Sequence, residues 1–280
     1  MEQDFLKAIE PIIEAGLTED INTGDITTNL LIAAGTQTTA VMIAKADGVI
    51  AGLPVAKLVF QKLDPKVEFT TSVSDGDTVK SGDLICTIKG AYRALLTGER
   101  LALNFLQRMS GIATETAKYV DAIKDTSTQI LDTRKTAPGL RLLDKYAVKA
   151  GGGTNHRIGL YDMVMIKDNH ISVAGGITNA VNAIRPYITA EIKIEVETTS
   201  IEEVKEALEA GADIIMLDNM DNVTMAQAVK LIDGRAKVEA SGNMNLDRVR
   251  EVAATGVDFI SIGALTHSVN ALDISQKIKE

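Results

Sequence analysis

The stretch EIKIEVETTSIEEVKEALEAGADIIMLD, residues 191–218, decides the fold class of this chain. It begins with a short β-branched run, EIKIEVE, continues through residues 200–210 with helical spacing, and ends in a second apolar run, DIIMLD. Strand, helix and strand in this order form a crossover unit whose two strands lie parallel in one sheet. The stretch therefore predicts an α/β fold with a parallel sheet.

The same unit recurs from about residue 113 onward. Further apolar runs are QILDTRK, DMVMIK, KVEAS and VDFISIG, and residues 172–185, 222–232 and 246–255 supply helical stretches between the later runs. Six such units favour a closed or nearly closed βα barrel over a short open sheet.

The first part of the chain has a different pattern. Residues 1–15 and 54–63 have helical spacing, and residues 39–50 are typical of a strand. The stretch SVSDGDTVKSGDLICTIKG places Asp-Gly and Ser-Gly turns between short alternating runs. We expect a separate N-terminal domain here, with a helix over residues 95–109 that joins it to the barrel.

Composition excludes several classes of partner. A formal net charge of -9, aromatic residues at 4% and the absence of Trp argue against nucleic acid. Cys86 is the single cysteine, so neither an intrachain disulfide nor a cysteine metal cage can form. No apolar run approaches the ~20 residues of a membrane span, and charges interrupt the first residues. We expect a cytoplasmic protein without nucleic-acid or membrane partners.

Polar residues or glycines follow each predicted strand of the barrel, where the reactive groups of such folds collect. Their chemistry is sorted along the chain: cations come first, carboxylates follow and small residues finish. In that order they are Arg134, Lys135, His156, Arg157 and Lys167, then Glu197 and Asp218, then Ser241-Gly242 and Gly263-Ala264.

Each group suits a different part of a ligand. Arginine and lysine bind carboxylates, a pair of carboxylates can hold Mg²⁺, and glycine turns that open helices present N–H groups to phosphate. Taken singly, these residues fit plainer interpretations, such as surface charges, helix caps or, for His156, a core histidine with internal partners. Lys193, Glu195 and Glu197 alternate and so face one side of a strand; if that side is the interior, they must pair or serve a ligand. Together the groups predict an anionic substrate that carries phosphate.

Longer motifs resemble those of one family, quinolinate phosphoribosyltransferase, over nearly the whole chain. The matching motifs are EDINTGDITT, LTGERLALNFLQRMSGIAT, LDTRKTAPGLR, KYAVKAGGGTNHRIGLYDMVMIKDNH, IEVET, IMLDN, EASGNM and ISIGALTHS. The resemblance implies an N-terminal α/β sandwich domain at residues 1–112 and an incomplete, TIM-like parallel βα barrel at residues 113–268. It also implies a C-terminal helix, within residues 269–280, that packs back on the N-terminal domain.

The family's reaction joins quinolinate to phosphoribosyl pyrophosphate with Mg²⁺ and yields nicotinate mononucleotide, pyrophosphate and CO₂, a step of NAD biosynthesis. The resemblance implies a homodimer, or a higher oligomer, in which Arg100 crosses the interface to complete the neighbouring site. It assigns the substrate's carboxylates and some phosphate oxygens to Arg100, Thr133, Arg134, Lys135, His156, Arg157 and Lys167.

The remaining assignments concern the sugar, the metal and the phosphate. Glu197 and Asp218 would act on the ribose hydroxyls and Mg²⁺, while Lys135 and Lys167 would stabilise developing charge. The phosphate would lie on the turns formed by Ser241, Gly242 and Asn243 and by Ile262, Gly263 and Ala264. Many relatives carry glycine where this chain has Asn243, so we expect the backbone N–H of Asn243, rather than its side chain, to serve. Arg141 is interpreted as a loop or helix-start charge outside the site.

Three alternatives stay open on the sequence. The first is a related barrel transferase that acts on nicotinate or another small acid, or a paralogue associated with molybdenum transport. The second is a non-catalytic nucleotide-binding module, which the two carboxylates beside an anion cluster disfavour. The third is an aldolase with Lys167 as a Schiff-base nucleophile, which borohydride trapping would reveal.

Overall fold

A computed structural model describes residues 2–279 of the chain. The chain forms two compact units. The first comprises Met1–Ala117, Thr136–Gly152 and Leu265–Glu280, and the second comprises Lys118–Lys135 and Gly153–Ala264. The predicted domain limits at residues 112 and 268 stay a prediction, and the segment Thr136–Gly152 is grouped with the first unit although it was expected in the barrel domain.

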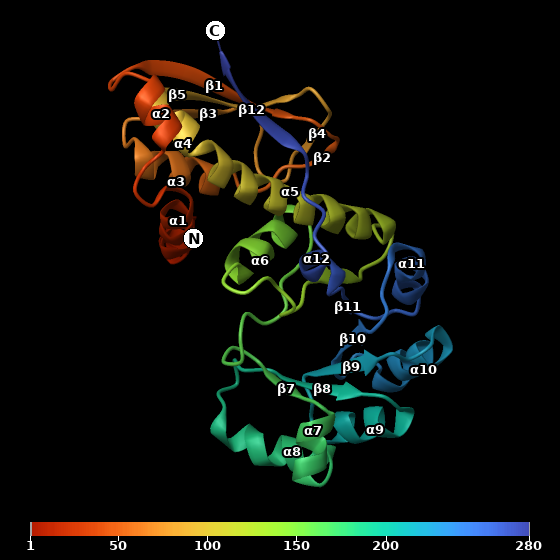
Figure 1. Ribbon diagram of the computed structural model, residues 1–280. Coiled ribbons are helices and arrows are strands. Elements are labelled where there is room, and N and C mark those ends of the chain that lie inside the picture. The colour runs from red at the N-terminus through yellow and green to blue at the C-terminus, as the bar shows by residue number, and fades with distance from the viewer. Residues whose placement is uncertain (1, 280) are drawn as a thin grey trace. The chain divides into compact units, whose positions relative to one another are not determined.

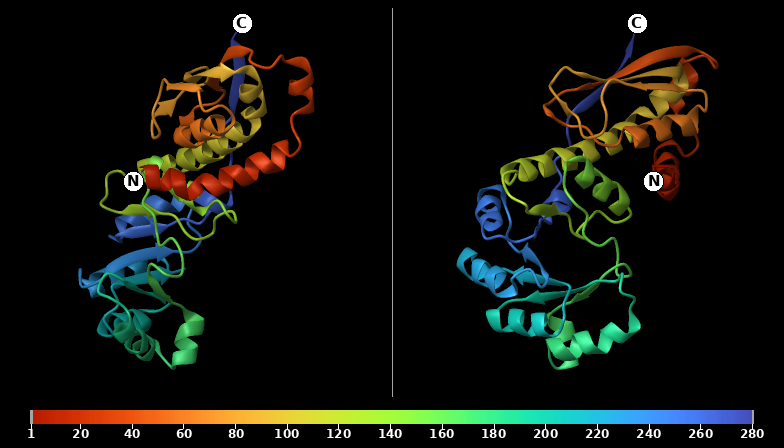
Figure 2. Two further views of the ribbon diagram at one scale, coloured as in Figure 1. Left: turned by 90° about the vertical axis from the view of Figure 1, so that its left-hand side faces the viewer. Right: turned by 180° about the vertical axis from the view of Figure 1, so that it is seen from behind.

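The first unit is built on an antiparallel sheet with the strand order β12-β1-β5-β3. Its strands are β1 (Gln37–Ala44), β3 (Glu68–Thr71), β5 (Leu84–Ala91) and β12 (Ile274–Lys279), and β2 (Gly48–Val49) pairs separately with β4 (Thr78–Val79). Helices lie on one face of the sheet (Figures 1 and 2). The helices of this part are α1 (Glu2–Ile21), α2 (Ile26–Leu31), α3 (Leu53–Leu63), α4 (Tyr92–Thr97), α5 (Glu99–Ala122) and α6 (Arg141–Ala150).

The C-terminal segment corrects one expectation. We expected a helix near residues 274–278, but Ile274–Lys279 is strand β12, which pairs antiparallel with β1 from Ala44↔Ile274 to Thr39↔Lys279. The edge of β1 offers a row of backbone donors and acceptors, and the segment satisfies its own groups by joining that row. Ile274 is 2% exposed, so the strand also buries apolar surface.

The second unit contains a parallel sheet of six strands in the order β6-β11-β10-β9-β8-β7. These are β6 (Gln129–Leu131), β7 (Val164–Ile166), β8 (Ile194–Thr198), β9 (Ile214–Asp218), β10 (Lys237–Ser241) and β11 (Phe259–Ser261). Each strand coincides with one of the six apolar runs of the sequence. The edge strands β6 and β7 do not pair with each other, and a bridge from Leu131 to Thr154 extends the β6 side. The predicted incomplete parallel α/β barrel is therefore confirmed.

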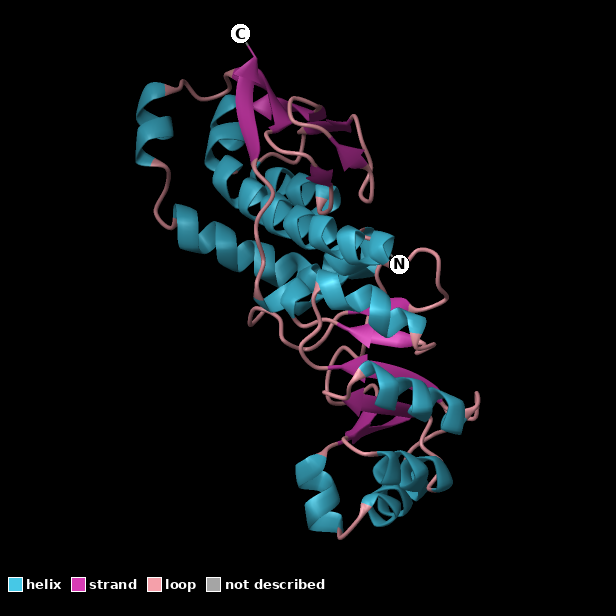
Figure 3. Ribbon diagram, turned by 90° about the vertical axis from the view of Figure 1, so that its right-hand side faces the viewer, coloured by secondary structure: helices cyan, strands magenta, loops and turns pink. Residues whose placement is uncertain are grey.

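Helices connect these strands and cover the outer face of the sheet (Figure 3). Side chains at their first turns satisfy the N–H groups that begin a helix. Ser200 accepts a hydrogen bond from Glu203 N, Asp221 from Thr224 N, and Asn245 from Arg248 N. The helices are α7 (Asp168–Ala174), α8 (Ile177–Ile184), the short η1 (Arg185–Tyr187), α9 (Ile201–Glu209), α10 (Asn222–Ile232) and α11 (Leu246–Ala254). The short α12 (Ala264–His267) follows β11, and its residues from Leu265 onward belong to the first unit.

The core of the second unit lies between the sheet and its helices. Ile215 and Leu217 of β9 are fully buried, as are Val204 of α9 and Ala228 of α10. Because strand side chains alternate, the other residues of each strand point to the opposite face of the sheet. That inner face carries the polar residues described below. Among the described residues, no helix is both long and apolar enough to cross a membrane.

Candidate active site

Strand register fixes which side chains share the inner face of the parallel sheet. Glu197 of β8 is in register with Met216 of β9, which is in register with Glu239 of β10. Residues in register point to the same side, and so do residues two apart on one strand. The shared face therefore carries Met165, Glu195, Glu197, Met216, Asp218, Glu239 and Ser241. Glu195 and Glu197 share this face as expected, whereas Lys193 precedes β8, is exposed, and has its Nζ 3.7 Å from Asp213 Oδ1.

The residues after β6 supply a structural carboxylate, Asp132, and a cation, Lys135. Asp132 is fully buried, and its carboxylate accepts hydrogen bonds from His156 N at 2.9 Å and Asn155 Nδ2 at 2.6 Å. Thr133 Oγ1 accepts a hydrogen bond from the Lys135 backbone N–H at 3.1 Å, while Lys135 itself is exposed. Asp132 thus anchors the loop of His156 to β6, and Lys135 reaches solvent beyond it.

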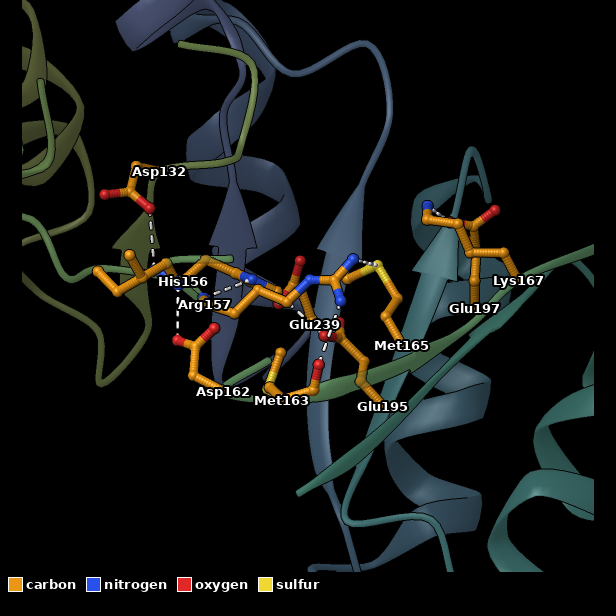
Figure 4. A network of polar contacts seen from close by, with 11 residues as sticks. Asp132, His156, Arg157, Asp162, Met163, Met165, Lys167, Glu195, Glu197 and Glu239 are labelled. Carbon is orange, nitrogen blue, oxygen red and sulfur yellow. Dashed lines mark hydrogen bonds and ion pairs between the residues drawn. The ribbon is translucent and has the colours of Figure 1, made fainter. Parts of the chain in front are cut away.

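His156 occupies a different position from the one expected. Its side chain is 7% exposed, and Nε2 lies 3.0 Å from a carboxylate oxygen of Glu195 and 3.3 Å from one of Glu239. Nδ1 accepts a hydrogen bond from Arg157 N at 2.8 Å. Both ring nitrogens face protein partners, and the substrate-binding role expected for this ring stays a prediction. The ring belongs to a buried network (Figure 4).

Arg157 extends from this network along the inner face (Figure 4). Its Nη1 donates to Met163 O at 3.1 Å, and its Nη2 lies 3.6 Å from Met165 Sδ. Burial, and next the neighbouring Arg134 guanidinium, lower the pKa of Arg157. Two cations that disfavour each other's charge are a ready site for an anion, because an anion relieves their repulsion. The assignment of Arg134 and Arg157 to the carboxylates of a substrate stays a prediction.

The ends of β7 and β8 are joined by an ion pair between Lys167 Nζ and Glu197 Oε2. The Lys167 side chain is 43% exposed and that of Glu197 is 18% exposed, so solvent and a ligand can reach the pair chiefly at the lysine. The Lys167 backbone N–H donates to His170 Nδ1 at 3.0 Å, so the His170 side chain caps the first turn of α7. Two predicted site residues, one cation and one carboxylate, are therefore in direct contact.

Three residues link the ends of β9 and β10. Asn219 Nδ2 donates to Asp218 Oδ2 at 2.8 Å, and Asn243 Nδ2 donates to Asn219 Oδ1 at 3.0 Å. Asn219 and Asn243 have φ values of 54° and 50°, a left-handed conformation that asparagine tolerates. A Cβ on Gly242 would lie 2.1 Å from Asn219 Oδ1, so only glycine fits. The side chain of Asn243 has a structural role that we did not predict.

The residues assigned to phosphate differ in burial and in whether their backbone N–H groups are already bonded. Ser241, Gly242, Gly263 and Ala264 are half-buried at the ends of β10 and β11. Ile262 is 1% exposed, and its N–H donates to Leu131 O at 2.9 Å. Its side chain is thus buried and its N–H is already bonded to Leu131 O, so Gly263 and Ala264 offer more to a phosphate than Ile262 does; the contact expected for Ile262 stays a prediction. Arg100 is exposed on α5 in the first unit.

Two groups of side chains have the chemistry of metal ligands. Glu197 and Asp218 offer carboxylate oxygens on the same face of neighbouring strands, and oxygen is the ligand that Mg²⁺ prefers. His156, Glu195 and Glu239 also have ligand atoms within 4.8 Å of one another. In the second group the imidazole Nε2 faces both carboxylates at 3.0 and 3.3 Å, so the protein itself supplies a partner for them there. Glu197 and Asp218 are the donors that fit Mg²⁺.

Sequence reasoning left Asp132, Glu195, Glu239, Asn219 and Arg248 off the site. Arg248 donates to Gly242 O at 3.2 Å and to Met220 O at 2.7 Å, and so ties both strand-end turns to α11. Glu239 is two residues before Ser241, and that spacing was a usable signal because it puts both on one face. The contacts of Asp132 and Asn219 depend on segments distant in sequence and had no such signal.

Two family models match this chain. The family model described as "Quinolinate phosphoribosyl transferase, C-terminal domain" matches residues 112–277, and the corresponding N-terminal domain model matches residues 25–110. The chain belongs to the quinolinate phosphoribosyltransferase family. The recognition made from its motifs is confirmed.

Members of this family align over almost the full chain. The chain is 48% identical to a probable nicotinate-nucleotide pyrophosphorylase [carboxylating] of Synechocystis sp., covering 96% of this chain and 92% of that protein. It is 47% identical to the chloroplastic rice (Oryza sativa) nicotinate-nucleotide pyrophosphorylase [carboxylating], covering 96% of this chain and 77% of that protein. The crystal structure of NadC from Streptococcus pyogenes superposes with a TM-score of 0.95 at 44% identity, covering 98% of this chain and 97% of that one. The family's two-domain α/β fold is therefore this chain's fold.

Proposed function

We propose that this chain is a quinolinate phosphoribosyltransferase, the carboxylating nicotinate-nucleotide pyrophosphorylase of NAD biosynthesis. It converts quinolinate and phosphoribosyl pyrophosphate to nicotinate mononucleotide, pyrophosphate and CO₂. The observation that carries the proposal is the inner face at the carboxyl ends of β7, β8 and β9. There Lys167 pairs with Glu197, and Asp218 shares the face of Glu197. Arg157 reaches the same face at Met165, so cations for a dicarboxylate and carboxylates for a sugar share one side of the sheet.

Substrate binding uses the cations first. Arg134, Arg157 and Lys167 bind the two carboxylates of quinolinate, with Arg100 reaching the site from a second subunit of a homodimer. A carboxylate of quinolinate replaces Glu197 as the partner of Lys167. Glu197 is thereby released toward the ribose hydroxyls, next to Asp218. Backbone N–H groups of Gly242, Asn243, Gly263 and Ala264 face the ribose phosphate.

The first step forms the bond between the ring nitrogen of quinolinate and the anomeric carbon as the bond to pyrophosphate breaks. Positive charge develops on the sugar, and the carboxylates of Glu197 and Asp218 stabilise it. These two residues would also hold Mg²⁺, which neutralises charge on the leaving pyrophosphate when bound. No covalent protein nucleophile is required, so the aldolase alternative, with Lys167 as a Schiff base, has no part in this scheme.

The second step removes the carboxylate next to the ring nitrogen. As the carbon–carbon bond breaks and CO₂ leaves, the electron pair stays on the ring carbon, where the adjacent quaternised nitrogen stabilises it by its positive charge. A proton from solvent then adds to that carbon. Lys135 and Lys167 stabilise the departing carboxylate and the developing charge as cations rather than as bases. We propose a cytoplasmic location, which the single buried Cys86 fits because it needs no oxidising compartment.

The test is an assay of two products with two acids. The purified protein is incubated with Mg²⁺, phosphoribosyl pyrophosphate and either quinolinate or nicotinate, and pyrophosphate and CO₂ are measured. Release of both products with quinolinate alone supports the proposal. Pyrophosphate release with nicotinate at a comparable rate would instead favour the related nicotinate-type transferase.

A further inference from the structure

Two carboxylates of the second unit are buried without a role in the reaction proposed above. Glu195 of β8 is fully buried and Glu239 of β10 is 1% exposed. Both lie on the inner face of the sheet, with β9 between their strands. A carboxylate so placed costs several kcal/mol in lost hydration unless a partner compensates it. Two carboxylates that each carry a desolvation cost therefore lie close together on the inner face of the sheet.

The compensating partner is the ring of His156. Its Nε2 lies 3.0 Å from Glu195 and 3.3 Å from Glu239, and its side chain is 7% exposed (Figure 4). Burial lowers the pKa of His156, but the contacts with Glu195 and Glu239 outweigh burial and raise that pKa to about 10. The hydrogen bond from Arg157 N to Nδ1 lowers the pKa of His156, because a second proton on the ring would occupy Nδ1 and break that hydrogen bond. With Nδ1 as the acceptor, Nε2 carries the proton and faces the carboxylates.

The ring in turn fixes the backbone of its own loop. Nδ1 accepts from Arg157 N at 2.8 Å, and His156 N donates to Asp132 Oδ1 at 2.9 Å. The next turn is held as well, because Asp162 accepts from Ile158 N at 2.7 Å and Gly159 N at 2.8 Å. The backbone of Arg157 is therefore defined on both sides. Among the described residues the guanidinium donates to Met163 O and contacts Met165 Sδ, and its five N–H groups exceed these two contacts, which leaves donors for a ligand.

We propose that Glu195 and Glu239 are positioning residues for Arg157 and act through the His156 ring. They clamp the ring between β8 and β10, and the ring holds the Arg157 backbone so that its guanidinium points along the inner face. The proposal rests on the proposed function, in which Arg157 binds a carboxylate of quinolinate. A misplacement of about 1 Å at a group that positions the substrate can lower the reaction rate by up to ~10²-fold, so loss of this clamp should have a measurable kinetic effect.

The test compares Glu195→Gln, Glu239→Gln and His156→Ala with wild type in steady-state kinetics. Glutamine keeps the size of the side chain and removes its charge. Each variant should raise the KM for quinolinate roughly tenfold and leave the KM for phosphoribosyl pyrophosphate within about twofold. Glu239→Gln combined with His156→Ala should be no worse than His156→Ala alone, since both act through one ring. Glu202→Gln, at the exposed start of α9, is the matched control and should change neither KM.

Three results would overturn the positioning role. They are equal rises of both KM values, fully additive effects of Glu239→Gln and His156→Ala, and a divalent ion that copurifies with wild type and is lost in His156→Ala. If a variant fails to fold, Glu239→Asp replaces it, because it keeps the charge and shortens the reach; a quinolinate KM equal to that of wild type in Glu239→Asp would count against the clamp. Wild-type turnover is measured first, and its absence would refute the proposed function rather than the positioning role. In that event quinolinate binding, measured by calorimetry on the same variants, tests the clamp directly, and unchanged affinity would contradict it.

Discussion

Lys167 and Glu197 form an ion pair at the carboxyl ends of the neighbouring strands β7 and β8. Part of the charge of the site is thus neutralised within the protein. A dicarboxylate that binds Lys167 must compete with Glu197, and the freed Glu197 is then available to the ribose. This exchange links the binding of one substrate to the alignment of a carboxylate for the other.

The exchange predicts opposite effects on binding and turnover in Glu197→Gln. Removing the charge of Glu197 frees Lys167, so quinolinate should bind at least as tightly as in wild type. The rate of turnover should fall by about 10²-fold or more, because a carboxylate that stabilises the developing positive charge is lost. Equilibrium dialysis and steady-state kinetics measure the two quantities. Weaker quinolinate binding together with normal turnover would contradict the exchange.

Lys135→Ala tests the role of the exposed lysine after β6. We expect turnover to be abolished with the fold intact, since the proposed role of Lys135 is to stabilise the departing carboxylate by its positive charge. Lys230→Ala is the matched control, because Lys230 is also an exposed lysine of the second unit and lies on α10, outside the proposed site. Near-normal activity of Lys135→Ala, with circular dichroism unchanged, would remove Lys135 from the site.

Gly242→Ala and Gly234→Ala separate a steric effect from a conformational one. Both glycines have positive φ, 92° and 71°, so alanine costs about 1–2 kcal/mol of unfolding free energy at either position. A Cβ meets nothing within 4 Å at Gly234 but lies 2.1 Å from Asn219 Oδ1 at Gly242. Gly242→Ala should therefore lose roughly a further 1–3 kcal/mol and raise the KM for phosphoribosyl pyrophosphate. Urea unfolding and kinetics measure both, and equal behaviour of the two variants would refute the interlock with Asn219.

Cys86 should be unreactive in the folded protein. The residue is fully buried in β5, and burial raises the pKa of its thiol to about 12. Because the folded state favours the protonated thiol, its contribution to stability is complete below the unfolded pKa of about 8.5 and is lost as pH rises toward 12. Iodoacetamide at a pH of about 8 should label Cys86 only after denaturant is added, since the thiolate is the nucleophile. Mass spectrometry checks this, and rapid labelling of the native protein would contradict the buried position.

The parallel sheet was predictable because its signal is local. Runs such as DIIMLD and KVEAS are short, β-branched and bounded by turns, and each coincides with a strand. The C-terminal segment was not predictable in the same way. Ile274 and Ile278 are four residues apart, a spacing that fits a helix face and a strand face alike. The edge of β1, more than two hundred residues earlier in the chain, decides the outcome.

In the candidate site, too, residues with a local sequence signal were predictable, and residues whose position depends on distant segments were not. Residue types at strand ends indicated Lys167, Glu197 and Asp218, because the carboxyl ends of parallel strands always meet at one edge. They did not indicate that His156 points into the protein, since this depends on Glu195 and Glu239, which lie on strands separated by β9. Ile262 was likewise assigned by its turn, whereas its N–H is used by Leu131 O in the sheet.

In the proposed reaction this chain couples the transfer of phosphoribose to the loss of one particular carboxylate. The most direct test uses quinolinate with an isotope label in the carboxylate next to the ring nitrogen, together with Mg²⁺ and phosphoribosyl pyrophosphate. We predict that labelled CO₂ and pyrophosphate appear in equal amounts, and that no label is released without phosphoribosyl pyrophosphate. Pyrophosphate release with the label retained in the product, or label release without the sugar substrate, would contradict the claim.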